Sequence, residues 1–378
     1  MSQAFIPFTQ PYLCGKEIEY VAEAITNKAL VGDGKYTHEA EHLISDLSGH
    51  VDAFLTPSCT DALDMTALLL NLEPEDEVIV PGFTFTSTAT AFASQKATVV
   101  FADIDPRTLN IDPKSIEKHI TDKTKAIVVV NYAGVACDFT QITELANAHD
   151  LVLIEDNAHG FGGKYRDQTL GSIGHLGTLS FHATKNIQCG EGGALLTRVS
   201  EFAERAHILR EKGTNRKAFL DGAVDKYTWV DLGSSFLTAD YVAAFLKAQL
   251  ESFKEIQELR ARVWNTYAEQ LKGWAEKIGA QLPFVPEYAT HTNHLFWLTM
   301  PDASHRRPFM EHLKELGIGS TFHYQSLAHS PAGKRFGRTN GTPVTDRTAD
   351  TIVRLPLFAD MNESDCARVV DAVLGWTL

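Results

Sequence analysis

LVLIEDNAHG, residues 151–160, is an apolar run that ends in two acids, Glu155 and Asp156, with His159 three residues after the second acid. The run is continuous rather than alternating, which is typical of a strand buried on both faces. A carboxylate at the end of such a strand is costly unless it is paired or hydrogen-bonded. The stretch therefore predicts either a cationic partner, such as a pyridinium or a metal ion, or a carboxylate that caps the following loop. Burial alone favours neither.

The next stretch along the chain is GTLSFHATKNIQCGEGGALLT, residues 177–197, in which a short strand is followed by Lys185 and then by a glycine-rich turn and another strand. A lysine held between buried strands loses hydration, which lowers its pKa and frees the amine to form imines with carbonyl compounds. Most lysines are solvated, however, so a plain loop lysine is the commoner reading of this stretch taken alone.

A third stretch lies upstream, at TPSCTDALDMTALLL, residues 56–70. It predicts a strand end, a turn and a helix start, with Ser58 or Thr60 as the residue that caps the helix. Free backbone amides and the positive end of the helix dipole make such a start a natural phosphate seat. A capped helix with no ligand is the alternative.

Around these stretches, apolar runs alternate with helix-like segments, which predicts an α/β fold built on a mainly parallel sheet. In such sheets ligands bind beyond the carboxyl ends of the strands. We expect strands at 51–56, 77–80, 98–102, 125–130, 151–154, 178–181 and 193–197, and helices near 60–71, 84–95, 112–120 and 138–149.

The pattern changes near residue 240. Apolar residues at steps of three or four predict one long helix over 240–272, which links to a second, smaller α/β unit. That unit contains a strand at 294–300 and a helix near 306–316. We therefore expect a large cofactor-binding domain at 1–250 and a smaller C-terminal domain at 251–378.

Composition narrows the class of protein. With 34 basic and 48 acidic residues among 378, the net charge is −14, which argues against nucleic acid as a partner. No apolar stretch is long enough to span a membrane, and no secretion signal is readable at the start. Five widely spaced cysteines fit a reducing compartment, so we expect a cytoplasmic protein.

Rival motifs are missing. There is no GxGxxG after the first strand and no GxxxxGK[ST], which disfavours dinucleotide-binding and P-loop folds. The spacing of His159, His175 and His182 matches no zinc template, so we expect no metal. A phosphate seat, a strand-end aspartate and a strand-end lysine, in this order on a parallel sheet, are what an enzyme using pyridoxal 5′-phosphate (PLP) needs.

The sequence also resembles the sugar aminotransferases of the DegT/DnrJ/EryC1/StrS family, a branch of the fold-type I PLP enzymes, along essentially its whole length. The segments that carry the resemblance are GDGKYT (32–37), LTPSCTDALDMTALLL (55–70), VIVPGFTFTSTA (78–89), TLNID (108–112), NYAGVACD (131–138), IEDNAHG (154–160), SFHATKN (180–186), GEGGALL (190–196), REKGTNR (210–216), DKYTWVDLGSS (225–235), FHYQSL (322–327) and RLPLF (354–358).

The resemblance implies a role for each matching residue. Lys185 is expected to bond the cofactor covalently and later to move the proton, and Asp156 to pair with the pyridine nitrogen. Phe85 is expected to stack on the cofactor ring and His159 to lie near its 3-hydroxyl. The phosphate is expected at Ser58, Cys59 and Thr60 with Ser180.

Within the family, segments 210–216, 225–235 and 322–327 resemble transaminases that make dTDP-4-amino-4,6-dideoxygalactose from dTDP-4-keto-6-deoxyglucose with L-glutamate as amino donor. A diphosphate needs basic residues in so acidic a protein, and the expected sugar-nucleotide contacts are Arg210, Lys212, Arg216, Lys226, His323 and Tyr324, with Lys217 in the same basic cluster. A solvated, charged loop is an equally good reading of that cluster.

Other readings remain open. The enzyme could aminate a different keto-sugar or give the gluco epimer. A sugar dehydratase of this fold is disfavoured, because such enzymes carry histidine where this chain has Lys185. A non-catalytic sensor is disfavoured because both Lys185 and Asp156 are present. The resemblance implies a homodimer with shared active sites. In many relatives an asparagine reaches the partner's phosphate, and Ser235 stands at about that position here.

Overall fold

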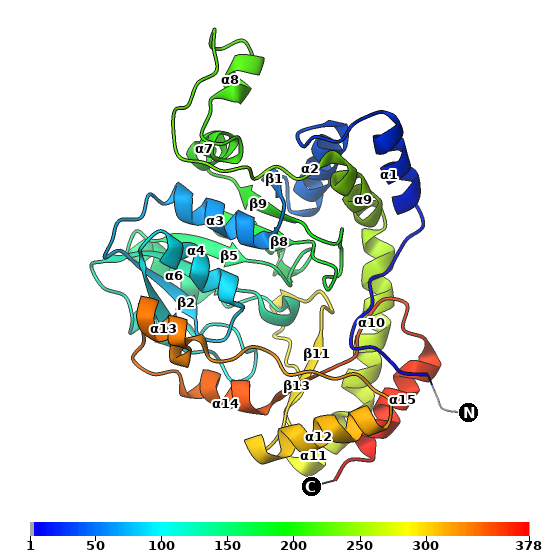
Figure 1. Cartoon of the computed structure of the whole chain (residues 1–378). Helices are drawn as coiled ribbons and strands as arrows, with labels where there is room; N and C mark the ends of the chain where they lie inside the picture. Colours follow the sequence, from blue (N-terminus) through cyan, green and yellow to red (C-terminus); the bar gives the residue numbers. More distant parts are fainter. Residues whose placement is uncertain (1–3, 378) are drawn as a thin grey trace.

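The computed structural model describes residues 4–377, and an eight-stranded sheet lies at its centre (Figure 1). The strands are β1 (Asp52–Thr56), β2 (Glu77–Pro81), β3 (Thr98–Ala102), β4 (Thr124–Val130), β5 (Val152–Asp156), β8 (Leu176–Ser180), β9 (Gly193–Thr197) and β12 (Gly337–Arg338). They lie in the order β1-β9-β8-β5-β4-β2-β3-β12. Neighbours from β8 to β12 run parallel, whereas β9 is antiparallel to both β8 and β1.

The mainly parallel α/β fold predicted from the sequence is therefore confirmed, and each strand expected in the first half of the chain is present. The edge strand β12 was not predicted. It consists of Gly337 and Arg338, which pair with Val99 and Val100, and two residues show no hydrophobic periodicity.

Side chains alternate between the two faces of the sheet, and helices cover both faces. Val78 and Val80 pack into one apolar cluster, whereas Ile79 packs into a cluster on the opposite face. Strands covered in this way read as continuous apolar runs. One face is covered by α3 (Cys59–Leu69), α4 (Thr86–Ser94) and α7 (Ser200–Arg210), and the other by α2 (Lys35–Leu47), α5 (Pro113–Glu117), α6 (Phe139–Ala148) and α9 (Asp240–Glu251).

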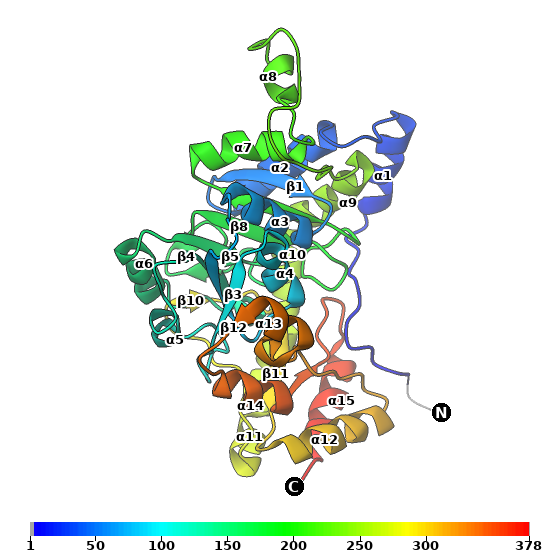
Figure 2. The same cartoon turned by 60° about the vertical axis from the view of Figure 1, so that its left-hand side comes forward.

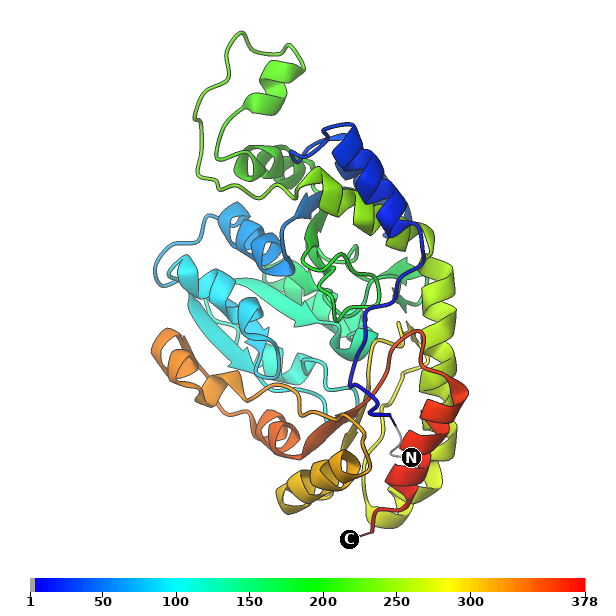
Figure 3. The same cartoon turned by 45° about the vertical axis from the view of Figure 1, so that its right-hand side comes forward.

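The prediction of one continuous helix over 240–272 was wrong. The segment forms α9, α10 (Phe253–Gln270) and the start of α11 (Lys272–Ile278), with a break at Ser252, whose ψ of 12° is not helical. The apolar stripe changes partners farther along, within α10. Ile256 still packs with the sheet, whereas Val263 packs with a second core. In Figure 3, α10 runs along one side of the molecule between these two parts.

The second core lies around a two-stranded antiparallel sheet. Its elements are β11 (Phe296–Thr299), β13 (Ile352–Leu355), α10, α11, α12 (Ala303–Glu315) and α15 (Glu363–Leu374). The strand and helix expected at 294–300 and 306–316 correspond to β11 and α12. Because α10 contributes to both cores, packing alone does not place a boundary at residue 250, and the division into two domains stays a prediction.

The remaining elements lie at the edges of these two cores. They are α1 (Glu17–Thr26), β6 (Lys164–Tyr165), β7 (Gln168–Thr169), β10 (Ala289–Thr290), α8 (Arg216–Leu220), α13 (Pro331–Phe336), α14 (Pro343–Thr351) and 3-10 turns at Tyr132–Gly134 and Leu327–His329. The segment around α8 projects beyond α7, away from the rest of the chain (Figures 1 and 2). No helix within residues 4–377 is both long and apolar enough to cross a bilayer.

Candidate active site

A cavity of about 660 Å³ lies between the carboxyl ends of the central strands and the second core. Its wall is built from the ends of β4, β5 and β8, the N-termini of α3 and α4, and residues around β13. This is the edge of a parallel sheet at which ligands are expected. The predicted site residues that line it are Ser58, Cys59, Thr60, Phe85, Asp156, His159, Ser180, Lys185, His323 and Tyr324.

The N-terminus of α3 forms one end of the cavity. Ser58 caps the helix by accepting a hydrogen bond from the Asp61 backbone N–H over 3.1 Å, and its hydroxyl donates to the Asp61 carboxylate over 2.8 Å. The cap was predicted from the sequence, with Ser58 or Thr60 as alternatives. Gly193 of β9 lies against this turn so closely that a Cβ there would stand 2.4 Å from the Cys59 nitrogen. Only glycine fits at that distance.

Asp156 ends β5 in the floor of the cavity and is buried. One carboxylate oxygen accepts from the Thr88 hydroxyl over 2.7 Å and the other from the Ala158 backbone N–H over 3.2 Å. Burial raises the pKa of Asp156, and these hydrogen bonds and the charge of Lys185 oppose that effect. Asp156 forms no ion pair within residues 4–377, so a cationic group in the cavity would find a desolvated carboxylate.

The sequence singled out Glu155 together with Asp156, and the structure separates their roles. Glu155 is buried away from the cavity and accepts hydrogen bonds from the backbone N–H groups of Gly171, Ile173 and Gly174. It therefore fixes the 171–174 loop, which is the loop-capping alternative, whereas Asp156 faces the cavity.

Lys185 lies in the turn between β8 and β9 and forms part of the cavity lining. Burial lowers the pKa of its amine to about 8, so a substantial fraction is neutral near physiological pH. The next residue, Asn186, anchors the turn. Its amide donates to Gln257 over 2.9 Å and to the Thr292 carbonyl over 2.7 Å, and its oxygen lies 2.7 Å from His294 Nδ1.

An aromatic and histidine wall completes the cavity. His159 Nδ1 accepts from the Ala133 backbone N–H over 3.3 Å, so a neutral His159 carries its proton on Nε2, which lies 3.4 Å from the Tyr324 hydroxyl. The Tyr132 hydroxyl lies 2.7 Å from His323 Nδ1. Burial lowers the pKa of His159 and of His323 well below the usual range, so both rings stay neutral.

Phe85 is exposed, unlike the buried rings of this wall. It precedes α4, lines the cavity, and leaves 57% of its surface exposed. An uncovered aromatic face beside a carboxylate, a lysine and a helix N-terminus fits a flat, charged ring with a phosphate tail, which is the shape of PLP. Ser58, Cys59, Thr60 and Ser180 would then hold the phosphate, Asp156 the pyridine nitrogen and Lys185 the aldehyde carbon.

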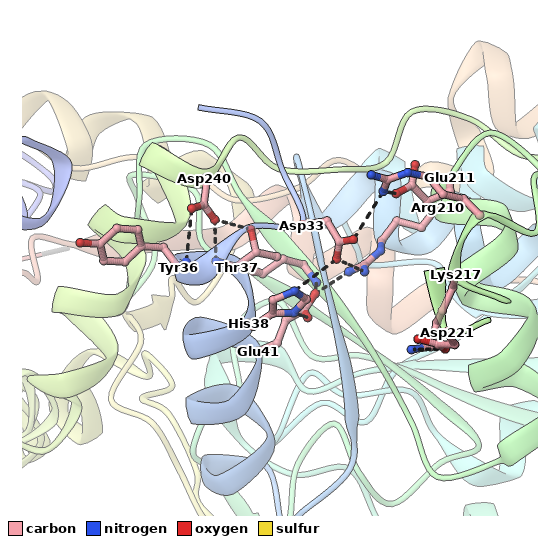
Figure 4. Close-up of polar contacts among 12 residues, drawn as sticks. Asp33, Tyr36, Thr37, His38, Glu41, Arg210, Glu211, Lys217, Asp221 and Asp240 are labelled. Atoms are coloured by element: carbon pink, nitrogen blue, oxygen red, sulfur yellow. Dashed lines mark hydrogen bonds and ion pairs between the residues drawn. The ribbon is translucent and has the colours of Figure 1, made fainter. Parts of the chain in front are cut away.

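The predicted basic cluster lies apart from this cavity in the single chain. Figure 4 shows Arg210 directed at Asp33 and Glu41, with an Arg210–Asp33 distance of 3.1 Å. Arg210 is buried, and Arg216 pairs with Glu211 over 2.7 Å. Within the chain, the charges of these two guanidinium groups are therefore paired with carboxylates.

The other residues of the cluster are exposed. Lys212 lies 3.7 Å from Glu211, Lys217 lies 3.3 Å from Asp221, and Lys226 belongs to the projecting segment after α8. Ser235 forms an isolated bridge with Glu211 and does not line the cavity of its own chain. Its expected reach to a partner subunit, and the sugar-nucleotide contacts of this cluster, stay predictions.

The cavity residues that were not predicted from the sequence include His294 and Arg354, and Thr88, which bonds the cavity residue Asp156, was not predicted either. Thr88 and Arg354 lie in segments that carry the family resemblance, VIVPGFTFTSTA and RLPLF, but no periodicity or motif singled them out. Long-range packing brings all three to the site, from α4, the segment before β11, and β13. Within residues 4–377, no group of three or more metal-ligating side chains is placed to hold a metal ion.

The sequence and the structure of this chain are both similar to aminotransferases. The profile of the DegT/DnrJ/EryC1/StrS aminotransferase family matches residues 11–374. An uncharacterized protein of Methanocaldococcus jannaschii, MJ1066, is 32% identical over 98% of this chain and 97% of its own. The aminotransferase TlmJ from Streptoalloteichus hindustanus superposes with a TM-score of 0.89 at 29% identity, covering 97% of both chains. Helicobacter pylori PseC, an aminotransferase involved in pseudoaminic acid biosynthesis, gives a TM-score of 0.88 at 25% identity over 98% of both chains.

Proposed function

The chain belongs to the DegT/DnrJ/EryC1/StrS aminotransferase family, and we propose that it is the member that aminates C4 of dTDP-4-keto-6-deoxyglucose, with L-glutamate as donor, to give dTDP-4-amino-4,6-dideoxygalactose. The observation that carries an aminotransferase reaction is the cavity itself. It holds a half-buried lysine whose pKa is lowered to about 8, a buried strand-end aspartate and a capped helix N-terminus.

PLP is the cofactor of this family, and when bound it supplies an electron-accepting ring that carries an amino group from donor to acceptor. The residues of the chain supply the rest. Asp156 would keep the ring nitrogen protonated, and Phe85 would cover one face of the ring. The neutral Lys185 amine would take the proton from Cα of the donor and hold it for return to the cofactor side. A pKa near the working pH suits a group that must both take and give a proton.

The keto-sugar assignment is supported by segments 210–216, 225–235 and 322–327, which resemble those of the dTDP-4-amino-4,6-dideoxygalactose transaminases. Two of those residues, His323 and Tyr324, line the cavity. Tyr324 has a positive φ of 31°, a strained conformation for an aromatic residue and one that is common at binding sites. The alternative within the family is another keto-sugar, or the gluco epimer of the same product.

We also propose a cytoplasmic homodimer with shared active sites. In it, the projecting segment around α8 and the cluster of Arg210, Lys212, Arg216 and Lys226 would serve the cavity of the partner subunit, with Ser235 near the partner's phosphate. The net charge of −14 supports a diphosphate-binding role for these basic residues, because an anionic diphosphate would otherwise be repelled by the chain.

One experiment tests the reaction and its stereochemistry together. Purified protein with PLP is incubated with dTDP-4-keto-6-deoxyglucose and L-glutamate, and the product is analysed by NMR. We expect an axial amine at C4 and 2-oxoglutarate in equal amount. An equatorial amine would support the gluco alternative. A protein that stays colourless with PLP and makes no amino sugar would contradict the aminotransferase reaction.

A further inference from the structure

Arg354, one of the cations that line the cavity, forms no ion pair with the described residues. Arg354 lies on β13, where its backbone is fixed on both sides. It pairs with Trp297 of β11, and it exchanges two backbone hydrogen bonds with Thr321, over 2.8 Å and 3.3 Å. The guanidinium carbon stands 4.7 Å from the centre of the Phe8 ring. The side chain is therefore held in place at the cavity wall.

The hydrogen-bond donors of Arg354 are mostly unused. Among the described residues, its guanidinium makes one hydrogen bond, from Nη2 to the Phe322 carbonyl over 3.2 Å, and Nε is covered without a partner. An arginine offers five N–H donors in a fixed fork. Arg354 forms no ion pair within residues 4–377, although the cost of covering a guanidinium is high without an anion.

The second arginine of the cavity wall provides a comparison. Arg260 is buried and donates to the backbone carbonyls of Asn293, His294 and Leu357, so its guanidinium is occupied in holding the chain. Arg354 has no such set of acceptors. Arg354 lines the same cavity, and most of its donors have no partner among the described residues.

The position of Arg354 also limits which anionic group of a substrate it can bind. Its charge contributes to the lowered pKa of Lys185, and it acts in the same direction on His159 and His323, so it lies near the reacting amine. The amino nitrogen of the donor must reach the position of the Lys185 amine. In an amino acid, the α-carboxylate carbon is only two bonds from the amino nitrogen. The diphosphate of a nucleotide sugar is attached across the sugar ring from the C4 ketone, much farther from the reacting atom.

Resting on the proposed aminotransferase reaction, we propose that Arg354 binds a carboxylate of the amino donor and so selects amino acids over simple amines. Two parallel N–H donors match the two oxygens of a carboxylate, and such charge-assisted pairs are strong and directional. A lysine would keep the charge and lose the fork.

The test uses the holoenzyme and the donor half of the reaction alone. L-Glutamate is titrated into the wild type and into Arg354→Gln, and the change in cofactor absorbance is recorded. We expect the half-saturating glutamate concentration to rise roughly 10- to 150-fold in R354Q, as for loss of a hydrogen bond to a charged group. Arg354→Lys should fall between the two. With an alkylamine that has no carboxylate, R354Q and wild type should react alike.

Arg306→Gln is the matched control. Arg306 also lies beside Phe322, with its guanidinium carbon 5.8 Å from that ring, but it lines a separate, smaller pocket. We expect R306Q to keep the wild-type glutamate response. A second measurement does not depend on turnover. Calorimetric binding of glutarate, a dicarboxylate without an amine, should be readily measurable in wild type and R306Q and lost in R354Q.

The outcomes separate the two proposals. Equal glutamate half-saturation and equal glutarate binding in R354Q and wild type would overturn the role of Arg354. A defect confined to the sugar-nucleotide half-reaction would also overturn it, because the arginine would then serve the diphosphate. A wild type that binds glutarate through Arg354 but transfers no amino group would contradict the proposed function and leave the carboxylate site standing.

Discussion

Thr88 donates a hydrogen bond to the carboxylate of Asp156 over 2.7 Å, and both side chains are buried. Thr84 lies 2.7 Å from the same Thr88 hydroxyl. Since the single proton of Thr88 is given to Asp156, the Thr84 hydroxyl is the donor to Thr88. This short chain of hydroxyls opposes the rise in the pKa of Asp156 that burial causes. It helps to keep the carboxylate ionised where a protonated ring nitrogen must be matched.

Replacing Thr88 by valine should therefore weaken cofactor binding. The variant keeps the shape of the side chain but removes a hydrogen bond to a charged group, which contributes about 1.5–3 kcal/mol. We expect the Kd for PLP, measured by fluorescence quenching, to rise by one to two orders of magnitude. Thr86→Val is the control, because Thr86 is exposed on the same helix and outside the cavity. Equal PLP affinity in the two variants would refute the role given to Thr88.

The lowered pKa of Lys185 should be visible in the stability of the cofactor-free protein. Its pKa falls from 10.5 to about 8 on folding, so between these values the unfolded chain binds more protons and stability rises with pH. At about 1.4 kcal/mol per pKa unit, the shift costs about 3 kcal/mol when the amine is charged in both states. Lys185→Met removes that cost.

We therefore expect K185M to resist urea better than wild type at pH 7, with the difference shrinking as pH rises from 8 to 10. Lys217→Met, at an exposed lysine of α8, is the matched control and is measured over the same pH range. A pH-independent difference for K185M would show that the lysine is not desolvated in the folded chain.

Gly193→Ala should damage the phosphate seat. A Cβ at this position would meet the backbone of Ser58 and Cys59 at 2.4 Å, so β9 and the start of α3 must separate. We expect PLP affinity to fall at least about tenfold and the melting temperature to drop, in line with overpacking costs of about 1–3 kcal/mol. Gly273→Ala on α11 is the counterpart, because nothing lies within 4 Å of its Cβ position. Normal PLP binding by G193A would refute the close contact.

Phe85 and Phe92 differ in how much of each side chain is exposed to solvent. Phe85 is 57% exposed at the cavity, whereas Phe92 of α4 is buried. Phe85→Ala should lower PLP affinity by about tenfold and leave the stability of the cofactor-free protein almost unchanged. Phe92→Ala should do the reverse and lower the free energy of unfolding by about 3–5 kcal/mol. Differential scanning fluorimetry with and without PLP separates the two. A large loss of stability of the cofactor-free protein in F85A would contradict this division.

Much of the fold was predictable because its signal is local. The apolar run at 151–154 and the cap at Ser58 each depend on a few consecutive residues, and both were placed within a residue or two. The break at Ser252 was missed because the apolar residues on both sides keep the helical spacing, so nothing in the periodicity marks it.

The same distinction applies to the site. Asp156 and Lys185 stand at strand ends, where sequence pattern and sheet topology together direct attention. Thr88 acts on Asp156, which lies 68 residues away in the chain, and Arg354 is proposed to act on a ligand. Nothing in the sequence next to either residue distinguishes it. The ion pairs of Arg210 with Asp33 and Glu41 could not be predicted either, because both acids come from the region around α2, far away in the chain.

The identity of the residue that bonds the cofactor tests the whole account most directly. Holoprotein reduced with borohydride and digested with protease should yield, by mass spectrometry, one pyridoxyl-labelled peptide with the label on Lys185. A label on another lysine, or no covalent label in a protein that otherwise binds PLP, would contradict it.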